Sequence, residues 1–245
     1  MVGAGRIGDG GGASHAGRAG IAVVEDAAHA CGSTYRGAPI GSHPGTQVFS
    51  FQATKNLTAV DGGMICLRSA DDAARARRLR WMGIDQDTWT RTTSSTYRWA
   101  YDVDEVGHRY SMNDLNAAIG LAHLPLLPAA NARRCAIAER YRRALAGLEA
   151  VTIVDPPADR TSATYLAAIL VDRRDDAVER LGRAGIETGV HYRRNDHHPL
   201  FGEPRDLPGA QAYWTRTLSL PLHLELTDEE VDAVIDAVRQ AVTPG

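Results

Sequence analysis

The sequence predicts an α/β fold in two parts, an α/β domain followed by a compact α+β domain. Short apolar segments rich in β-branched and aromatic residues alternate with longer segments that carry apolar residues at helical spacing. The 245 residues are 44% hydrophobic and 23% charged, as in a globular protein that can bury a core. After residue 150 the elements become shorter and more closely spaced, so we place the boundary in the long helical segment just before this point.

The first domain is expected to span residues 21–128, behind a head of residues 1–20. The head contains eight glycines and almost no large apolar residues, so we expect it to be disordered. In this domain we expect strands at 21–24 (buried), 46–51 and 63–67. A helix is predicted at 70–82, entered through Ser69, and a second at 112–124, stopped by Pro125. Between these helices we expect a long ordered loop at 84–108.

The second domain, residues 129–245, is expected to open with a helix at 129–148. Strands are predicted at 151–154, 166–171, 187–192 and 217–220, with a helix at 175–184. Thr227 is followed three residues later by Glu230, the pattern of a capping box, so the last helix begins there. Its apolar positions recur on one face, namely Val231, Val234, Ile235, Val238 and Val242.

Composition and charge argue against several classes of protein. The formal net charge is −3 with both signs interleaved, and nucleic-acid binding would need a clustered basic face. Three cysteines, without metal-ligand spacing, do not indicate a disulfide framework and fit a reducing cytoplasm. No signal segment or membrane-length apolar run is found. We therefore expect a cytoplasmic protein without nucleic-acid or membrane partners.

Asp26 is the first candidate site residue, because it ends the first predicted strand. Open α/β sheets place functional groups at such strand ends. A buried carboxylate there needs a cationic partner, and the protonated nitrogen of pyridoxal 5'-phosphate (PLP) would be one. A cap on the following turn is an equally good interpretation of this residue alone.

Lys55 is the second candidate, because it follows an apolar strand and is the only lysine in the chain. A lysine in a dry pocket loses part of its affinity for the proton and becomes a nucleophile. An exposed lysine is the ordinary alternative. However, a chain that otherwise uses arginine and keeps one lysine indicates a need for an amine that can deprotonate, which arginine cannot provide.

Several motifs in a fixed order now resemble the DegT/DnrJ/EryC1/StrS family of PLP-dependent sugar aminotransferases. The resemblance covers nearly everything from residue 20 onward, through segments 24–30, 50–57, 61–64, 110–120, 131–148, 185–192 and 218–223. It implies a fold-type I transferase, with a partial large domain built on a mixed, mostly parallel sheet and a small C-terminal α+β domain.

The resemblance also implies roles for individual residues. Lys55 matches the Schiff-base lysine, and Asp26 matches the carboxylate that pairs with the pyridinium nitrogen. His29 matches the residue that reaches the ring hydroxyl oxygen, and Ser50 matches a hydroxyl donor to the cofactor phosphate. Arg109 stands where many relatives carry an asparagine that reaches the neighbouring subunit's cofactor phosphate.

A His- and Arg-rich loop matches the family's loop near the substrate pocket. His191, Tyr192, Arg193 and Arg194 are its candidate substrate-binding residues, since the guanidinium fork suits the diphosphate of a nucleotide sugar. A solvated loop is the alternative. The nearby His197 and His198 have no second ligand cluster at metal spacing, so no metal is expected.

Two departures from the family matter. Relatives carry a further N-terminal stretch with a Gly-Thr/Ser turn for the phosphate and an aromatic residue over the pyridine ring, and residues 1–20 match neither. Where relatives show an aromatic-His pair before Leu166, this chain has Thr164 and Tyr165. The first departure leaves an alternative to an active enzyme, a catalytically incomplete fragment or partner subunit.

The leading hypothesis is a PLP-dependent aminotransferase that acts on a keto group of a nucleotide-linked sugar. The resemblance implies glutamate or glutamine as the amino donor and a homodimer as the assembly. Lys55 argues against the family's dehydratase branch, in which histidine replaces the lysine.

Overall fold

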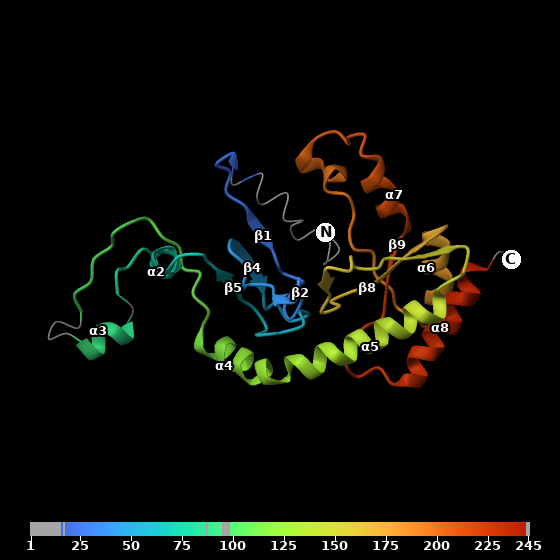
Figure 1. Ribbon diagram of the computed structural model, residues 1–245, viewed down its shortest axis with the longest axis horizontal. Coiled ribbons are helices and arrows are strands. Elements are labelled where there is room, and N and C mark those ends of the chain that lie inside the picture. Colours follow the sequence, from blue (N-terminus) through green and yellow to red (C-terminus); the bar gives the residue numbers. More distant parts are fainter. Residues whose placement is uncertain (1–15, 17, 87, 95–98, 244–245) are drawn as a thin grey trace. The chain divides into compact units, whose positions relative to one another are not determined.

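The structure, a computed structural model, describes residues 16, 18–86, 88–94 and 99–243 (Figure 1). Contacts divide these residues into two compact units. Of the described residues, we call residue 16 and residues 18–28 together with Ala38–Pro125 the N-terminal unit, and His29–Gly37 together with residues 126–243 the C-terminal unit. Most of the predicted disordered head, residues 1–15 and 17, lies outside the described residues.

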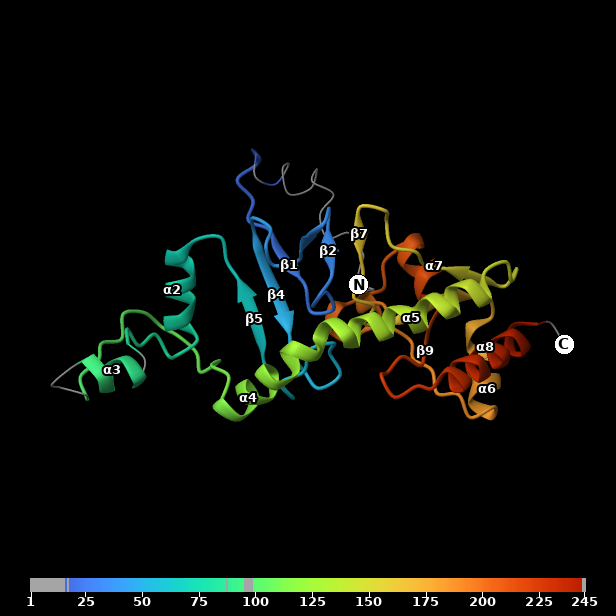
Figure 2. The same cartoon turned by 60° about the horizontal axis from the view of Figure 1, so that its bottom comes forward.

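The N-terminal unit contains a mixed three-stranded sheet, whose strands lie side by side in Figure 2. Its order is β1 (Val24–Asp26), β4 (Thr46–Ser50), β5 (Gly63–Cys66). The β1 and β4 strands run parallel, whereas β4 and β5 run antiparallel. The sheet is therefore mixed, as the family resemblance implied, with one parallel and one antiparallel pairing among the described strands.

The first strand differs from its prediction in place and in burial. It begins at Val24 rather than at residue 21, and Val24 is 66% exposed where a buried strand was expected. The edge position of β1 is not the reason, because Val48, on the same face of the central strand β4, is also 38% exposed. The described residues leave this face of the sheet partly uncovered. An apolar run shows that a strand is present but does not show what covers it.

Three helices follow in this unit, namely α2 (Ala70–Leu79), α3 (Thr88–Ser94) and α4 (Asp114–His123). Ser69 caps α2 as predicted, since its hydroxyl accepts a hydrogen bond from the Asp72 amide at 3.0 Å. The helix ends three residues before the predicted end because Met82 (φ 61°) and Gly83 (φ 75°) adopt left-handed conformations.

The predicted loop at 84–108 was wrong in one part, because it contains α3. Here the Thr92 and Thr93 hydroxyls donate to the Trp89 carbonyl, each at 2.9 Å. Such a short polar helix carries no apolar stripe, so hydrophobic periodicity does not reveal it.

The predicted stop at Pro125 is a single turn of 3-10 helix, η1 (Leu124–Leu126), after which α5 (Leu127–Leu145) begins. Proline is compatible with the first turn of a helix, and α5 begins two residues earlier than predicted because Pro128 occupies its first turn.

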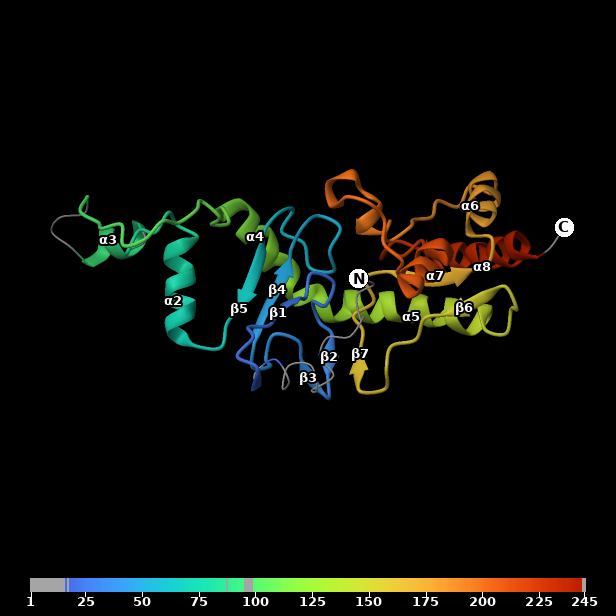
Figure 3. The same cartoon turned by 90° about the horizontal axis from the view of Figure 1, so that it is seen from above.

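The C-terminal unit contains an antiparallel sheet in the order β6 (Val151–Ile153), β8 (Ala167–Val171), β9 (Thr217–Leu220). Helices α6 (Arg174–Arg183) and α8 (Asp228–Val242) pack with α5 against it, and Figure 3 shows α5 and α8 side by side. Between them lies the core, whose fully buried members include Ile137, Tyr141, Leu145, Val171, Leu181, Leu218, Val231 and Val238.

The remaining elements are short. They are β2 (Thr34–Tyr35), which pairs with β7 (Arg160–Thr161) in the C-terminal unit, β3 (Ala38–Pro39), η2 (Asn195–His197), η3 (Pro199–Phe201) and α7 (Pro208–Arg216). No helix in the described ranges is long and apolar enough to span a membrane.

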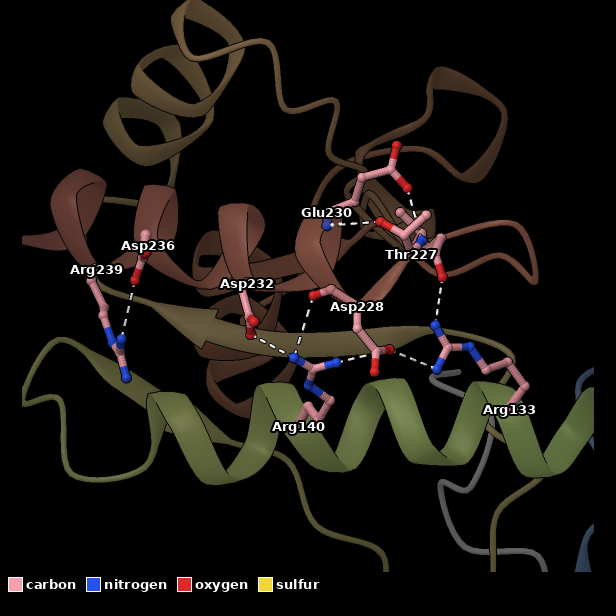
Figure 4. Close-up of polar contacts among 9 residues, drawn as sticks. Arg133, Arg140, Thr227, Asp228, Glu230, Asp232, Asp236 and Arg239 are labelled. Carbon is pink, nitrogen blue, oxygen red and sulfur yellow. Dashed lines mark hydrogen bonds and ion pairs between the residues drawn. The ribbon is translucent and has the colours of Figure 1, made fainter.

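The predicted capping box of α8 is confirmed (Figure 4). The Thr227 hydroxyl accepts from the Glu230 amide at 3.2 Å, and the Glu230 carboxylate accepts from the Thr227 amide at 2.8 Å. Figure 4 also shows Asp228 in the first turn of α8. Its carboxylate forms ion pairs with Arg133 (2.9 Å) and Arg140 (2.8 Å) of α5. The acidic helix N-terminus is thereby joined to α5.

The predicted strand at 187–192 was wrong. Only Gly189 pairs, with its amide and carbonyl both bonded to Ser219 of β9 at 3.0 and 2.7 Å. The alternating sequence indicates extended backbone, and an extended segment can pair with a neighbouring strand at one residue only. A strand would need the neighbouring residues to pair as well.

Candidate functional site

Asp26 and Ser50 lie at the carboxyl ends of two parallel strands. In the register of the sheet Asp26 is opposite Val48, and Ser50 lies two residues further along β4. Side chains alternate along a strand, so Asp26, Val48 and Ser50 share one face. The pairing continues beyond β1, since the Ala27 amide donates to the Val48 carbonyl at 2.9 Å. The sheet thus places a carboxylate and a hydroxyl at the same end of one face.

The Asp26 side chain is exposed, although a buried carboxylate was expected. One of its oxygens accepts from the Ala28 amide at 3.0 Å, so the turn-capping interpretation describes part of its role. No ion pair to Asp26 occurs among the residues that the structure describes. The second carboxylate oxygen can therefore meet a cation.

Lys55 lies in a tight turn directly after β4. Its amide donates to the Gln52 carbonyl at 2.9 Å, and the Thr54 amide and hydroxyl donate to the Gln52 side-chain oxygen at 3.0 and 2.7 Å. Leu57 and Ala59, 6% and 1% exposed, anchor the chain beyond it. The Lys55 side chain is half-buried. The hydrogen-bonded turn and the two buried anchor residues fix the backbone at Lys55, five residues after Ser50.

Gly63 is required where β4 and β5 meet. A Cβ atom at this position would lie 2.5 Å from the Phe49 carbonyl oxygen, which is backbone and cannot move aside. The Phe51 amide also donates to the Gly62 carbonyl at 2.8 Å. The two glycines therefore let the strand after the Lys55 turn approach β4 closely.

The chemistry of this set fits PLP. A carboxylate can pair with the pyridine N–H, a hydroxyl can donate to the phosphate, and an amine can bond to the aldehyde. Asp26, Ser50 and Lys55 all belong to the N-terminal unit.

His29 belongs to the C-terminal unit and lies in a cluster of aromatic rings there. Its ring centroid is 4.0 Å from that of Tyr165, with 32° between the planes, and 6.5 Å from that of Tyr192. Tyr192 also meets His191 edge-on at 4.8 Å. Burial and the nearby Tyr165 raise the pKa of Tyr192 above its ordinary value.

The four predicted substrate residues line one hollow of about 980 Å³ in the C-terminal unit. The His191 Nδ1 lies 2.9 Å from the Ser219 hydroxyl, which fixes the imidazole against β9. Arg193 donates to the His197 carbonyl at 2.9 Å and is otherwise exposed. Other lining residues include Cys135, Arg160, Thr164, Tyr213 and Trp214.

Arg194 differs from its neighbours because the protein itself occupies its guanidinium. The group donates to both Asp196 oxygens, to the Gln211 side chain at 2.6 Å and to the Arg205 carbonyl at 2.7 Å. Only 7% of the side chain is exposed. Hydrogen bonds from Arg194 and from the Arg205 amide hold the pKa of Asp196 well below its ordinary range. These contacts favour a role for Arg194 in shaping the loop.

Arg109 lies in the N-terminal unit, exposed, with its guanidinium 5.4 Å from the centroid of the Trp81 ring. Its backbone pairs with that of Trp81. Among the described residues, no group of three or more His, Cys, Asp or Glu side chains could hold a metal ion.

Sequence reasoning assigned no role to Ser219, Asp196 or Tyr165. Asp196 lies only two residues from its partner Arg194, inside the loop that the sequence had already indicated. Ser219 gave no such local signal, since its partner His191 is 28 residues away in the chain.

The mixed α/β sheet carries Asp26 and Ser50 at its strand ends and Lys55 in the turn beyond, a set compatible with a PLP-binding enzyme. Comparison with solved structures shows the fold of the fold-type I PLP-dependent aminotransferases. The model of the DegT/DnrJ/EryC1/StrS aminotransferase family matches residues 13–239, and the chain belongs to this family.

Three solved structures illustrate the likeness. AtS13 from Actinomadura melliaura is 36% identical with a TM-score of 0.87, and the match covers 96% of this chain and 63% of that one. The sugar aminotransferase CalS13 from Micromonospora echinospora is 34% identical, with a TM-score of 0.82 and coverage of 90% and 58%. S. venezuelae DesV in complex with a ketimine intermediate is 29% identical, with a TM-score of 0.85 and coverage of 98% and 63%. The chain thus spans about three fifths of the length of these proteins.

Proposed function

We propose that the chain binds PLP at Lys55 and transfers an amino group to a keto group of a nucleotide-linked sugar. Glutamate or glutamine is the proposed donor. The observation that carries the proposal is the placement of Asp26 and Ser50 on one face at the ends of paired parallel strands, with the only lysine in the turn beyond. Membership of a family of PLP-dependent aminotransferases supports it.

Each residue has a distinct task in this proposal. Asp26 would keep the pyridine nitrogen protonated, and Ser50 would donate to the phosphate. Lys55 would hold the aldehyde carbon and afterwards move a proton between the substrate carbon that bears nitrogen and the C4' carbon of the cofactor. PLP, when bound, supplies an electron sink. His29 would meet the ring hydroxyl oxygen, and Arg109 would meet a cofactor phosphate in place of the asparagine of relatives.

The substrate would bind through the hollow lined by His191, Tyr192, Arg193 and Arg194. A guanidinium suits a diphosphate, and the exposed Arg193 is the better placed of the two arginines to provide one. Arg194 would then contribute mainly by holding the loop in shape.

We propose a homodimer in a reducing cytoplasm as the working state. Two strongly exposed apolar residues on α4 support the dimer, namely Leu115 (79%) and Leu121 (70%), together with Val106 (90%) in the segment between α3 and α4. The three cysteines are all free, which supports the location.

The test is a visible absorbance spectrum with added PLP, followed by borohydride reduction and peptide mass spectrometry. A reduced cofactor adduct on Lys55, absent from Lys55→Ala and Lys55→Arg, is the expected result. If the wild type forms no adduct and Lys55→Ala changes nothing, the proposal fails. Turnover is then assayed with a nucleotide-linked keto sugar and glutamate or glutamine. An adduct without turnover would favour the alternative that the chain completes its site only with another polypeptide.

A further inference from the structure

The turn before Tyr165 is strained and firmly held. Thr164 has φ of 50°, a left-handed conformation that a β-branched residue rarely adopts. Its amide donates to the Ser162 hydroxyl at 3.0 Å, and the preceding Ala163 amide donates to the buried Ser33 hydroxyl at 3.0 Å. The structure around Thr164 therefore imposes this backbone geometry.

Helix α5 fastens both this turn and the segment that carries His29. The Cys135 thiol lies 3.4 Å from the Ser162 carbonyl and 3.4 Å from the Thr164 hydroxyl. One helical turn earlier, the side-chain Nδ2 of Asn131 donates to the Cys31 carbonyl at 3.1 Å. Asn131 and Cys135 are four residues apart and so lie on the same face of α5.

The close approach to Asn131 depends on a glycine. Gly32 has φ of 89°, and a Cβ atom there would lie 2.3 Å from the Asn131 side-chain nitrogen. Gly32 therefore lets the segment just after His29 lie close against Asn131 of α5. Both partners of the His29–Tyr165 stack are held on one scaffold.

We propose that Tyr165 is a positioning residue that fixes the plane of the His29 imidazole. The two rings lie 4.0 Å apart at 32°. Stacking uses the faces of the imidazole, so it does not compete with hydrogen bonds that the ring nitrogens make in the ring plane, the proposed one to a cofactor oxygen included. The hydroxyl of Tyr165 is not needed for this role. The hydrogen bond from His29 to a cofactor oxygen rests on the proposed function.

The first measurement needs no cofactor. Histidine-labelled protein is studied by NMR, with the His29 ring signals assigned through His29→Gln. Tyr165→Leu should remove the ring-current shift of the His29 protons, whereas Tyr165→Phe should retain it. Tyr110→Leu is the matched control, since it removes a separate His–Tyr stack, that of His108 and Tyr110 at 4.9 Å. Unchanged His29 signals in Tyr165→Leu would overturn the proposal.

The second measurement is a double-mutant cycle on PLP affinity and on the absorbance maximum of the bound cofactor. Tyr165→Leu is expected to weaken PLP binding by about tenfold, as the loss of an orienting partner does in ligand sites. Tyr165→Phe should bind as the wild type does. The variant that combines His29→Ala with Tyr165→Leu should bind no more weakly than His29→Ala alone.

Additive losses in that cycle would show that Tyr165 does not act through His29 and would overturn the proposal. If the wild type binds no PLP, the proposed function fails, and the NMR measurement still tests the stack by itself.

Discussion

Arg194 and Asp196 form a nearly buried ion pair, with Arg194 Nε 3.0 Å from Asp196 Oδ1 and side chains only 7% and 15% exposed. Gln211 of α7 and the backbone of Arg205 complete the arrangement. Because the same loop carries His191, Tyr192 and Arg193, this pair ties the walls of the hollow to α7.

Asp196→Asn is expected to lower the Tm, because it leaves the Arg194 guanidinium buried without a counter-ion. The loss should depend on pH. The pKa of Asp196 is lowered in the folded protein, so the stability it contributes is present above the ordinary aspartate pKa of about 3.9 and is lost as pH falls below that value.

Thermal unfolding of both proteins from pH 7 to pH 3 checks this. Other carboxylates with lowered pKa values are common to both, so the difference in Tm isolates Asp196. That difference should shrink as the pH falls below about 4. A difference that stays constant across this range would contradict the prediction. Asp236→Asn, at an exposed ion pair with Arg239, is the control and should change little.

Gly63→Ala should destabilise the protein by about 1–3 kcal/mol, because the new methyl group would meet the Phe49 carbonyl oxygen of β4. Urea denaturation gives the free energy of unfolding. Gly182→Ala is the matched control. Gly182 lies within α6 with nothing near its Cβ position, so alanine there should stabilise by about 0.5–1 kcal/mol. Equal effects of the two substitutions would argue against the close contact.

Thr227→Ala should cost about 1 kcal/mol, since it removes the side-chain half of the capping box of α8. Thr227→Ser keeps the hydroxyl and should retain most of the stability. The same denaturation measurement compares them. A serine variant as unstable as the alanine variant would mean that the methyl group, and not the hydrogen bond, provides the stabilisation.

Asp26→Asn tests the cofactor side of the proposed function. A neutral amide cannot keep the pyridine nitrogen protonated, so we expect transamination to fall by about a hundredfold or more while the adduct on Lys55 still forms. Steady-state rates and the borohydride adduct are measured together. Asp71→Asn, in the exposed first turn of α2, should leave both unchanged. Full activity of Asp26→Asn would remove this carboxylate from the site.

Local chemistry made part of the fold predictable. The Ser69 cap, the capping box at Thr227 and β9 at Thr217–Leu220 were all predicted correctly, because each depends on residues close together in the chain. Boundaries set by more distant contacts were less predictable, as the exposed β1 and the single bridge at Gly189 show.

The sequence by itself determined which residues can carry the chemistry. Asp26 and the only lysine were identifiable as candidates because strand ends and residue types are local properties, whereas Ser50 became a candidate through the family resemblance. The tertiary structure alone decided that Tyr165 stacks on His29, and that the protein itself occupies the guanidinium of Arg194. The stack joins segments more than a hundred positions apart in the chain. The strained Thr164 is held by the neighbouring Ser162 and by Cys135 of α5, 29 positions away. Contacts between distant segments leave no periodic or local pattern in a sequence, because packing, and not chain proximity, selects the partners.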